Sequence, residues 1–414
     1  MLAFVAAAAA LILAIALHVP DPQISPALAE RRADVTHGAY IAVLGDCAAC
    51  HTAPGGSALA GGLPLSTPLG TVYSTNITPD PETGIGKYSF KDFVRVMRLG
   101  VRPDGTRLYP AMPYTSYAKM SDEDLQDLFA YLQQSSPVDE ADRANPIPWP
   151  LSIRWPLALW NIAFLDDSRF VADSFKDAQW NRGAYLVEAL EHCGECHTPR
   201  HATQSLNNSK KFAGAVAQGW KAYNITASPQ SGIGGWTDAQ LALYLTTGHA
   251  EGHSSASGPM AEAIVDSLRY LKPDDIHAIV VYLRSIPPID NAPAIALNPP
   301  AATAEAPPTS LGAQVFAGNC ANCHDWDGKG VQSPYAALLG SRTVNDPAAT
   351  NLLAILLSGS SAPLPAEHVF MPPFVRGHSD DELAAVANFV NGYFGNGTAQ
   401  ITAADFSSAR MALH

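Results

Sequence analysis

The pentapeptide Cys47-Ala48-Ala49-Cys50-His51 organises this 414-residue chain, because the chain repeats its pattern twice more. The other copies are Cys193-Gly194-Glu195-Cys196-His197 and Cys320-Ala321-Asn322-Cys323-His324. Cys-x-x-Cys-His is the attachment signature of c-type haem: two thiols on one helical turn bond the two vinyl groups, and the next histidine ligates the iron. We therefore expect three haem c groups, with Cys47, Cys50, Cys193, Cys196, Cys320 and Cys323 as covalent anchors and His51, His197 and His324 as iron ligands.

Two other interpretations of the cysteines are weaker. A structural zinc site gathers its ligands in fours, and nothing in the sequence pairs these three motifs. A thioredoxin-like redox centre lies in a βαβ setting, which no motif has. The three copies also use all six cysteines, so none is left for a structural disulfide or a cysteine-bound iron–sulfur cluster.

Length and composition suit a globular protein of about three domains. The chain is 47% apolar and 15% charged, with a formal net charge of −13. An acidic surface argues against binding to nucleic acid through a basic face. Because thioether-linked haem is normally made outside the cytoplasm, we expect the periplasmic side of a bacterial inner membrane.

Each motif lies between two expected helices. A helical stretch with a Gly-Ala pair, at Gly38, Gly183 or Gly312, leads into the motif. A loop rich in glycine and proline follows, and then an amphipathic closing helix with an acidic first turn. The expected closing helices are Asp122–Gln134, Pro273–Ser285 and 380–392. The sequence thus predicts a mainly α fold of three tandem cytochrome c-type helical domains, preceded by an apolar anchor helix.

These patterns divide the chain into seven segments. They are a membrane anchor or signal segment (1–29), domain 1 (30–144), a connector (145–177), domain 2 (178–286), a Pro/Ala-rich linker (287–308), domain 3 (309–395) and a tail (396–414).

Residues 2–17 form an uninterrupted apolar run, with a length between that of a signal segment and that of a spanning helix. No lysine or arginine precedes it, and Ala27-Leu28-Ala29 resembles a cleavage site that lies well beyond it. We expect a retained anchor, with cleavage near Glu30 as the alternative.

Two further stretches have two interpretations each. The segments Asn76-Ile77-Thr78 and Asn224-Ile225-Thr226 could hydrogen-bond a haem propionate or could simply build a turn. The tryptophan-rich stretch 145–164 could pack between domains, which we favour, or face a partner or the membrane interface.

Methionines supply the expected sixth ligands. Met112, Met260 and Met371 each lie beside a proline, in an expected loop before a closing helix. His/Met coordination closes the iron and suits electron transfer. Met97, Met120 and Met411 are the other choices. His192, which adjoins the second motif, or His249 or His253 would make the second haem bis-His. We expect most of the ten histidines outside the motifs to lie on the surface.

The chain from about Thr36 to Gly395 resembles the three-haem cytochrome c subunit of membrane-bound bacterial dehydrogenases for alcohol, aldehyde, gluconate, fructose or sorbitol. The resembling stretches are Tyr73-Ser74-Thr75-Asn76-Ile77-Thr78-Pro79-Asp80, Tyr109-Pro110-Ala111-Met112-Pro113-Tyr114, Trp149-Pro150-Leu151-Ser152-Ile153-Arg154-Trp155-Pro156-Leu157 and 193–199. The resemblance implies ligation by the three histidines and three methionines named above, and electron delivery to ubiquinone.

Two further stretches of sequence predict the catalytic partner. Gly258-Pro259-Met260-Ala261-Glu262-Ala263 and Leu271-Lys272-Pro273-Asp274-Asp275 look most like the cytochrome subunit of aldehyde dehydrogenases. That resemblance implies a molybdopterin subunit and a small iron–sulfur subunit as partners. The alternatives are a PQQ alcohol dehydrogenase, a flavin (FAD) gluconate or fructose dehydrogenase and, less favoured, a stand-alone multihaem peroxidase. On its own the chain is expected to be an electron-transfer subunit with no catalytic residue.

Overall fold

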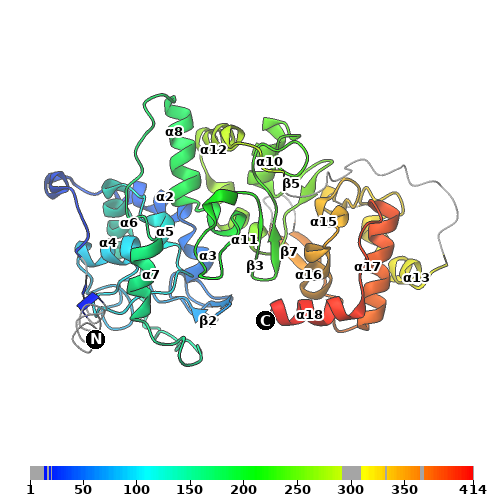
Figure 1. Ribbon diagram of the computed structural model, residues 1–414, viewed down its shortest axis with the longest axis horizontal. Coiled ribbons are helices and arrows are strands. Elements are labelled where there is room, and N and C mark those ends of the chain that lie inside the picture. Colours follow the sequence, from blue (N-terminus) through cyan, green and yellow to red (C-terminus); the bar gives the residue numbers. More distant parts are fainter. Residues whose placement is uncertain are drawn as a thin grey trace, which may run out of the picture. The chain divides into compact units, whose positions relative to one another are not determined.

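The computed structural model describes residues 14–15, 18–19, 21–290, 309–331, 333–363 and 368–413. The chain forms two compact units, Met1–Glu195 and Cys196–His414. Helices dominate both units, and each sheet in the described residues is a two-stranded antiparallel hairpin (Figure 1). The predicted mainly α fold class is confirmed.

In unit 1, the first domain is built on two helices that cross closely, α2 (Val35–Leu44) and α6 (Asp122–Gln134). Gly38 lies at the crossing, where an added Cβ would stand 1.9 Å from the Asp127 carbonyl oxygen. Only glycine permits this approach. The closing helix α6 begins and ends where the sequence predicted.

The segment between the first motif and α6 is more regular than the predicted loop. It holds β1 (Pro64–Thr67), β2 (Gly70–Tyr73), α4 (Phe90–Leu99) and α5 (Tyr114–Tyr117). A capping box between Ser89 and Asp92 starts α4, and Gly100, at φ 62°, ends it. The prediction of a simple loop is therefore wrong here. The 3₁₀ helix η1 (Pro26–Glu30) precedes the domain.

The tryptophan-rich connector contains helix α7 (Pro156–Phe164). Its inner face packs on the first domain: Tyr114 Oη donates to Asn161 Oδ1 at 2.9 Å, and Asn161 Nδ2 donates to the Leu99 carbonyl at 2.8 Å. Other connector side chains are exposed: Trp149, which precedes α7, is 81% accessible, and Ile162, on α7, is 69% accessible. These contacts of α7 are with the first domain, and the expected packing between domains stays a prediction.

Unit 1 also includes the helices that lead into the second motif, α8 (Ala178–Tyr185) and the π-helical turn η2 (Leu186–Leu190). Tyr185 Oη donates to the Asp124 carboxylate at 2.5 Å, and Lys119 pairs with Glu188 at 3.3 Å. These bonds attach the opening helix of the second domain to the first domain.

Unit 2 holds the rest of the second domain and all of the third. The second-domain elements are α9 (Gly194–His197), η3 (Asn208–Lys210), β3 (Ala215–Ala217), β4 (Trp220–Ala222), α10 (Asp238–Thr247), β5 (His249–Ala250), β6 (Ser254–Ser255), α11 (Pro259–Asp266), η4 (Leu268–Tyr270) and α12 (Pro273–Ser285). The third-domain elements are α13 (Leu311–Asn319), α14 (Ala321–His324), η5 (Pro334–Ala336), α15 (Arg342–Asn345), α16 (Thr350–Ser358), β7 (Ser360–Pro363), β8 (His368–Met371), α17 (Asp380–Phe394) and α18 (Ala403–Leu413). The closing helix α12 matches its prediction, and α17 runs two residues further than expected.

The third domain repeats the helix crossing of the first. Helix α13 packs on α17 at Gly312, where a Cβ would lie 2.2 Å from the Ala385 carbonyl oxygen. The predicted tail also contributes, because α18 packs on α16 and α17 and buries Phe406 completely. An ion pair of 2.6 Å between Arg410 and Asp380 fastens it.

Within unit 2, helix α16 of the third domain bonds to strand β4 of the second. Asn351 accepts from the Lys221 backbone N–H at 2.7 Å and donates to the Lys221 carbonyl at 3.0 Å. The Lys221 ammonium pairs with Asp346 at 2.8 Å. The second and third domains are therefore joined by specific polar contacts.

In the part of the chain that the structure describes, no helix is long and apolar enough to cross a membrane. Most of the predicted apolar run, residues 2–13 and 16–17, and most of the predicted linker, residues 291–308, lie outside the described residues. The seven segment boundaries stay predictions.

Candidate haem-binding sites

Each Cys-x-x-Cys-His motif contains a short helical turn. The turns are α3 (Cys47–His51), α9 (Gly194–His197) and α14 (Ala321–His324). This is the geometry in which two thiols and an imidazole can serve one macrocycle. No cluster of three or more His, Cys, Asp or Glu side chains that could hold a metal ion occurs in the described ranges, so the zinc interpretation gains no support.

The three motif histidines share one orienting bond. The Nδ1 atom lies 2.6 Å from a backbone carbonyl oxygen in every case: His51 to Thr75, His197 to Tyr223 and His324 to Ala336. Because a carbonyl only accepts, each Nδ1 must carry the proton. Nε2 is then left as a lone-pair donor, which is what an iron ligand requires.

Burial keeps these imidazoles neutral. Desolvation lowers the pKa of His51, His197 and His324, and it outweighs the carbonyl bond, which favours the protonated form. A protonated imidazole cannot ligate a metal. The buried, oriented and neutral histidines therefore fit iron ligation in all three motifs.

The Asn-x-Thr segments position two of the accepting carbonyls. Asn76 follows Thr75, and its side chain accepts from the Thr78 N–H at 2.9 Å and donates to the Val138 carbonyl at 2.7 Å. In the second domain, Asn224 likewise accepts from Thr226 and donates to Ile289. The turn interpretation is therefore favoured over the propionate interpretation.

In the third motif, the same hydrogen bond joins residues that are closer in sequence. The accepting carbonyl, that of Ala336, lies only twelve residues after His324, at the end of the 3₁₀ helix η5. The hairpins β1–β2 and β3–β4 lie between the histidine and its carbonyl in the first two domains, and the described residues between His324 and Ala336 hold no such hairpin. The bond is kept although the connecting chain differs.

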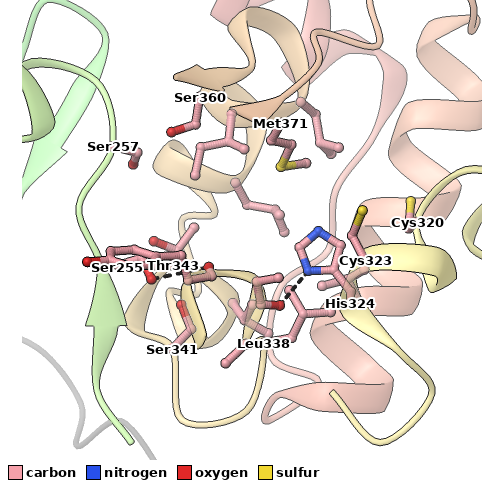
Figure 2. Close-up of a pocket in the computed structure, with 18 of the residues that line it drawn as sticks. Ser255, Ser257, Cys320, Cys323, His324, Leu338, Ser341, Thr343, Ser360 and Met371 are labelled. Atoms are coloured by element: carbon pink, nitrogen blue, oxygen red, sulfur yellow. Dashed lines mark hydrogen bonds between the residues drawn. The ribbon is translucent and has the colours of Figure 1, made fainter. Parts of the chain in front are cut away.

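A cavity of about 560 Å³ lies beside the third motif. Cys320, Cys323 and His324 line it from one side, and Met371, at the end of β8, lines it from another (Figure 2). Apolar side chains such as Leu338 and Val390 complete much of the wall. Volume, thiols, imidazole, thioether and apolar lining together fit a haem c.

The candidate methionines differ in burial and in the elements on which they lie. Met97 and Met120 are buried in the core of the first domain, and Met411 is 76% exposed on α18. Met112 lies in the turn before α5. Met260 lies in the first turn of α11, which corrects the expectation of a loop. Met112 and Met260 stay predicted ligands.

Some of the histidines outside the motifs make specific contacts. His37 bonds the buried Asp127 carboxylate at 2.9 Å. His253 is buried, and its ring stacks on Trp236 with centroids 4.0 Å apart. His249 bonds Ser255 at 3.0 Å. These contacts join residues that are distant in the sequence or that lie in short hairpins, so spacing alone gave no signal for them.

Comparison with known proteins shows the family to which this chain belongs. The cytochrome c family profile matches residues 35–136 and 309–393. The fructose dehydrogenase cytochrome subunit of Gluconobacter japonicus is 41% identical over 404 residues, covering 92% of this chain and 83% of that protein. The gluconate 2-dehydrogenase cytochrome c subunit of Pantoea cypripedii is 40% identical, covering 94% and 91%. The cytochrome c subunit of the quinone alcohol dehydrogenase of Gluconacetobacter polyoxogenes is 38% identical, covering 91% and 84%. The chain therefore belongs to the family of cytochrome c subunits of dehydrogenases.

Proposed function

We propose that this chain is the three-haem electron-transfer subunit of a membrane-bound dehydrogenase. It would receive electrons from the cofactor of a catalytic subunit and pass them to ubiquinone on the periplasmic side of the inner membrane. The observation that carries the proposal is the bond of 2.6 Å from Nδ1 to a backbone carbonyl, present at all three motif histidines.

Haem iron closed by histidine and methionine supplies a one-electron redox centre without an open site for substrate. The residues that would hold the three groups are the cysteine pairs and histidines of the motifs, with Met112, Met260 and Met371 on the opposite faces. Met371 has the best support, because it lines the same cavity as His324. Met112 and Met260 are supported by their positions in the first two domains, each after a middle helix and before the closing helix.

A redox titration of the purified chain tests the proposal. Three low-spin haems that do not bind carbon monoxide rapidly in the ferrous state would support closed His/Met coordination. Rapid carbon monoxide binding by all three haems, or peroxide turnover by the isolated chain, would instead favour a peroxidase.

We also propose which class of catalytic subunit gives electrons to this chain. The sequence resemblance favours a molybdopterin aldehyde dehydrogenase with a small iron–sulfur subunit. The relatives serve fructose, gluconate and alcohol dehydrogenases at nearly equal identity, so PQQ and flavin partners stay open. Purification in mild detergent, followed by identification of the subunits and cofactor that co-purify, separates these partners. A chain that purifies with no dehydrogenase subunit would contradict the proposal.

A further inference from the structure

The carbonyl that orients His324 is held differently from its counterparts in the other two domains. There, an asparagine follows the accepting carbonyl and fixes the turn with side-chain bonds. In the third domain Ala337 follows Ala336, and an alanine side chain can make no such bond. The turn is the three-residue helix η5, in which the Ala336 N–H donates to the Ser333 carbonyl and the Ala337 N–H to the Pro334 carbonyl. Because so short a 3₁₀ helix is weak by itself, other contacts must fix this carbonyl.

The second domain supplies such contacts from the end of α10 and from the hairpin β5–β6. Ser255 Oγ donates to the Tyr335 carbonyl at 3.2 Å, and Tyr335 Oη donates to the Thr247 carbonyl at 2.8 Å. The Tyr335 carbonyl belongs to the peptide unit that joins this residue to Ala336. Ser255 and His324 line the same cavity (Figure 2). Two bonds from the second domain therefore hold the residue directly before the accepting carbonyl.

His249 gives the Ser255 hydroxyl its direction. His249 Nδ1 lies 3.0 Å from Ser255 Oγ, and its ring lies against the Tyr335 ring, with centroids 5.0 Å apart. Because the Tyr335 carbonyl only accepts, the hydroxyl proton must point to it, and the hydroxyl oxygen then accepts from His249 Nδ1. The three groups thus form one directed chain from the imidazole through the hydroxyl to the carbonyl.

The turn of the hairpin is also fixed on the third domain. The Arg342 backbone N–H donates to the His253 carbonyl at 3.1 Å. An added Cβ at Gly340 would stand 2.7 Å from the Gly252 carbonyl oxygen, so the two backbones approach closely. The hairpin therefore contacts the third domain both at η5 and just after it.

We propose that hairpin β5–β6 of the second domain, through Ser255 and Tyr335, positions the Ala336 carbonyl and thereby tunes the third haem. The inference rests on the proposed haem at His324. A hydrogen bond donated by Nδ1 makes an imidazole a stronger electron donor to its metal. Stronger donation favours ferric iron, so contact with the second domain lowers the reduction potential of the third haem. Ser255 and Tyr335 are positioning residues that act through the Ala336 carbonyl.

Redox titration of the holoprotein that carries Ser255→Ala and Tyr335→Phe together tests this role. The double substitution removes both bonds to the segment before Ala336. We expect the reduction equilibrium constant of one haem to rise about tenfold, which is about 59 mV for a one-electron couple, with the other two haems unchanged. Each single substitution should give part of the shift. Should the double variant fail to incorporate haem, the single variants decide the question in the same way.

Two matched variants serve as controls. Ser255→Thr keeps the hydroxyl donor and should keep the wild-type potential. Ser254→Ala removes the neighbouring hydroxyl, which donates within the hairpin to the Ser255 carbonyl at 3.4 Å, and should change no potential. Equal shifts for Ser254→Ala and Ser255→Ala would overturn the proposed role of the Ser255 hydroxyl.

Removal of the third haem identifies which haem responds. In a chain with Cys320→Ser and Cys323→Ser, the double substitution should leave both remaining potentials unchanged. A shift that persists in this chain refutes the inference, and so does the absence of a shift in the chain with three haems. A haem count that does not fall on removal of the cysteine pair would instead contradict the proposed haem at His324, and with it the proposed function.

Resonance Raman spectroscopy checks that the effect passes through His324. Met371→Ala opens the sixth position of the third haem, so the ferrous protein should show its iron–histidine stretching band. Loss of the Ser255 and Tyr335 bonds should lower the frequency of this band, because a weaker bond at Nδ1 reduces donation to iron. A shifted potential with an unchanged frequency would refute the inference. If Met371→Ala gives no such band, Met371 is not the ligand, and the titrations decide.

Discussion

At each motif histidine, one hydrogen bond orients the imidazole ring for the iron ligation that we propose. In each domain a backbone carbonyl fixes the tautomer and the ring orientation, and burial keeps the ring neutral. A backbone acceptor serves this purpose whatever the local side chains are, which explains why Thr75, Tyr223 and Ala336 can occupy equivalent places.

Met371 gives a prediction at this scale. Met371→Ala removes the thioether from the cavity shared with His324 and opens the sixth position of the third haem. We expect the ferrous protein to bind carbon monoxide at one haem per chain, seen as a partial shift of the Soret band. Met411→Ala, on the exposed face of α18, should bind none. Equal behaviour of the two variants would show that Met371 is not the ligand.

Asp127 gives a second residue-scale prediction, on acid stability. Burial raises the pKa of this fully buried carboxyl, but bonds from Arg31, the Asp34 N–H and His37 prevail and lower it to about 2, from 3.8. Because the folded pKa is depressed, its stabilisation is present above pH 4 and is lost as pH falls towards 2. The shift corresponds to about 2 kcal/mol.

Acid and urea unfolding of Asp127→Asn tests this point. At pH 6 the first domain should be less stable than wild type by about 2 kcal/mol, and the difference should shrink towards pH 2. Asp139→Asn, at an exposed position, is the control and should change little. A deficit that stays constant down to pH 2 would mean that the charge of Asp127 is not the cause.

At the scale of elements, helix α13 offers two glycines with opposite expectations. Gly312→Ala places a Cβ against the Ala385 carbonyl at the crossing with α17 and should destabilise the third domain by about 1–3 kcal/mol. Gly318 lies on the same helix with nothing within 4 Å of an added Cβ, so Gly318→Ala should stabilise it by about 0.5–1 kcal/mol. Thermal unfolding followed by circular dichroism measures both, and the same sign for both would contradict the crossing geometry.

Helix α18 is a further test at this scale. Phe406→Ala should cost about 3–5 kcal/mol, because the ring is fully buried among α16, α17 and α18. Met411→Ala, at an exposed position of the same helix, should cost less than about 0.5 kcal/mol. Similar denaturation midpoints for the two variants would show that α18 does not belong to the core of the third domain.

The sequence predicted some secondary-structure elements correctly and missed others. The closing helices Asp122–Gln134 and Pro273–Ser285 were correct at both ends, because an acidic first turn and apolar spacing mark them. The middle helix α4 was missed although Ser89 and Asp92 form a capping box, since glycine and proline on both sides suggested a loop. The cysteines and histidines of the site were evident from the motif. The carbonyls that orient the histidines were not, because Thr75, Tyr223 and Ala336 lie well beyond the motifs in sequence and share no residue type.

At the scale of the whole molecule, the part of the second domain that lies in unit 2 contacts the third domain. Ser255, Ser257 and Ala261 of the second domain line the cavity of the third motif, so its wall is shared (Figure 2). Ala261 follows the predicted ligand Met260 on helix α11. One short helix would therefore serve two haems, an arrangement that suits direct electron transfer between them.

The central claim is that each of the three motifs holds one haem. Pyridine haemochrome analysis of the purified chain, related to protein mass, counts covalent haem directly. We expect three per polypeptide, and two after the cysteines of any one motif are replaced together, for example Cys320→Ser with Cys323→Ser. A wild-type value of two or fewer, or no loss on removing a cysteine pair, would contradict the account.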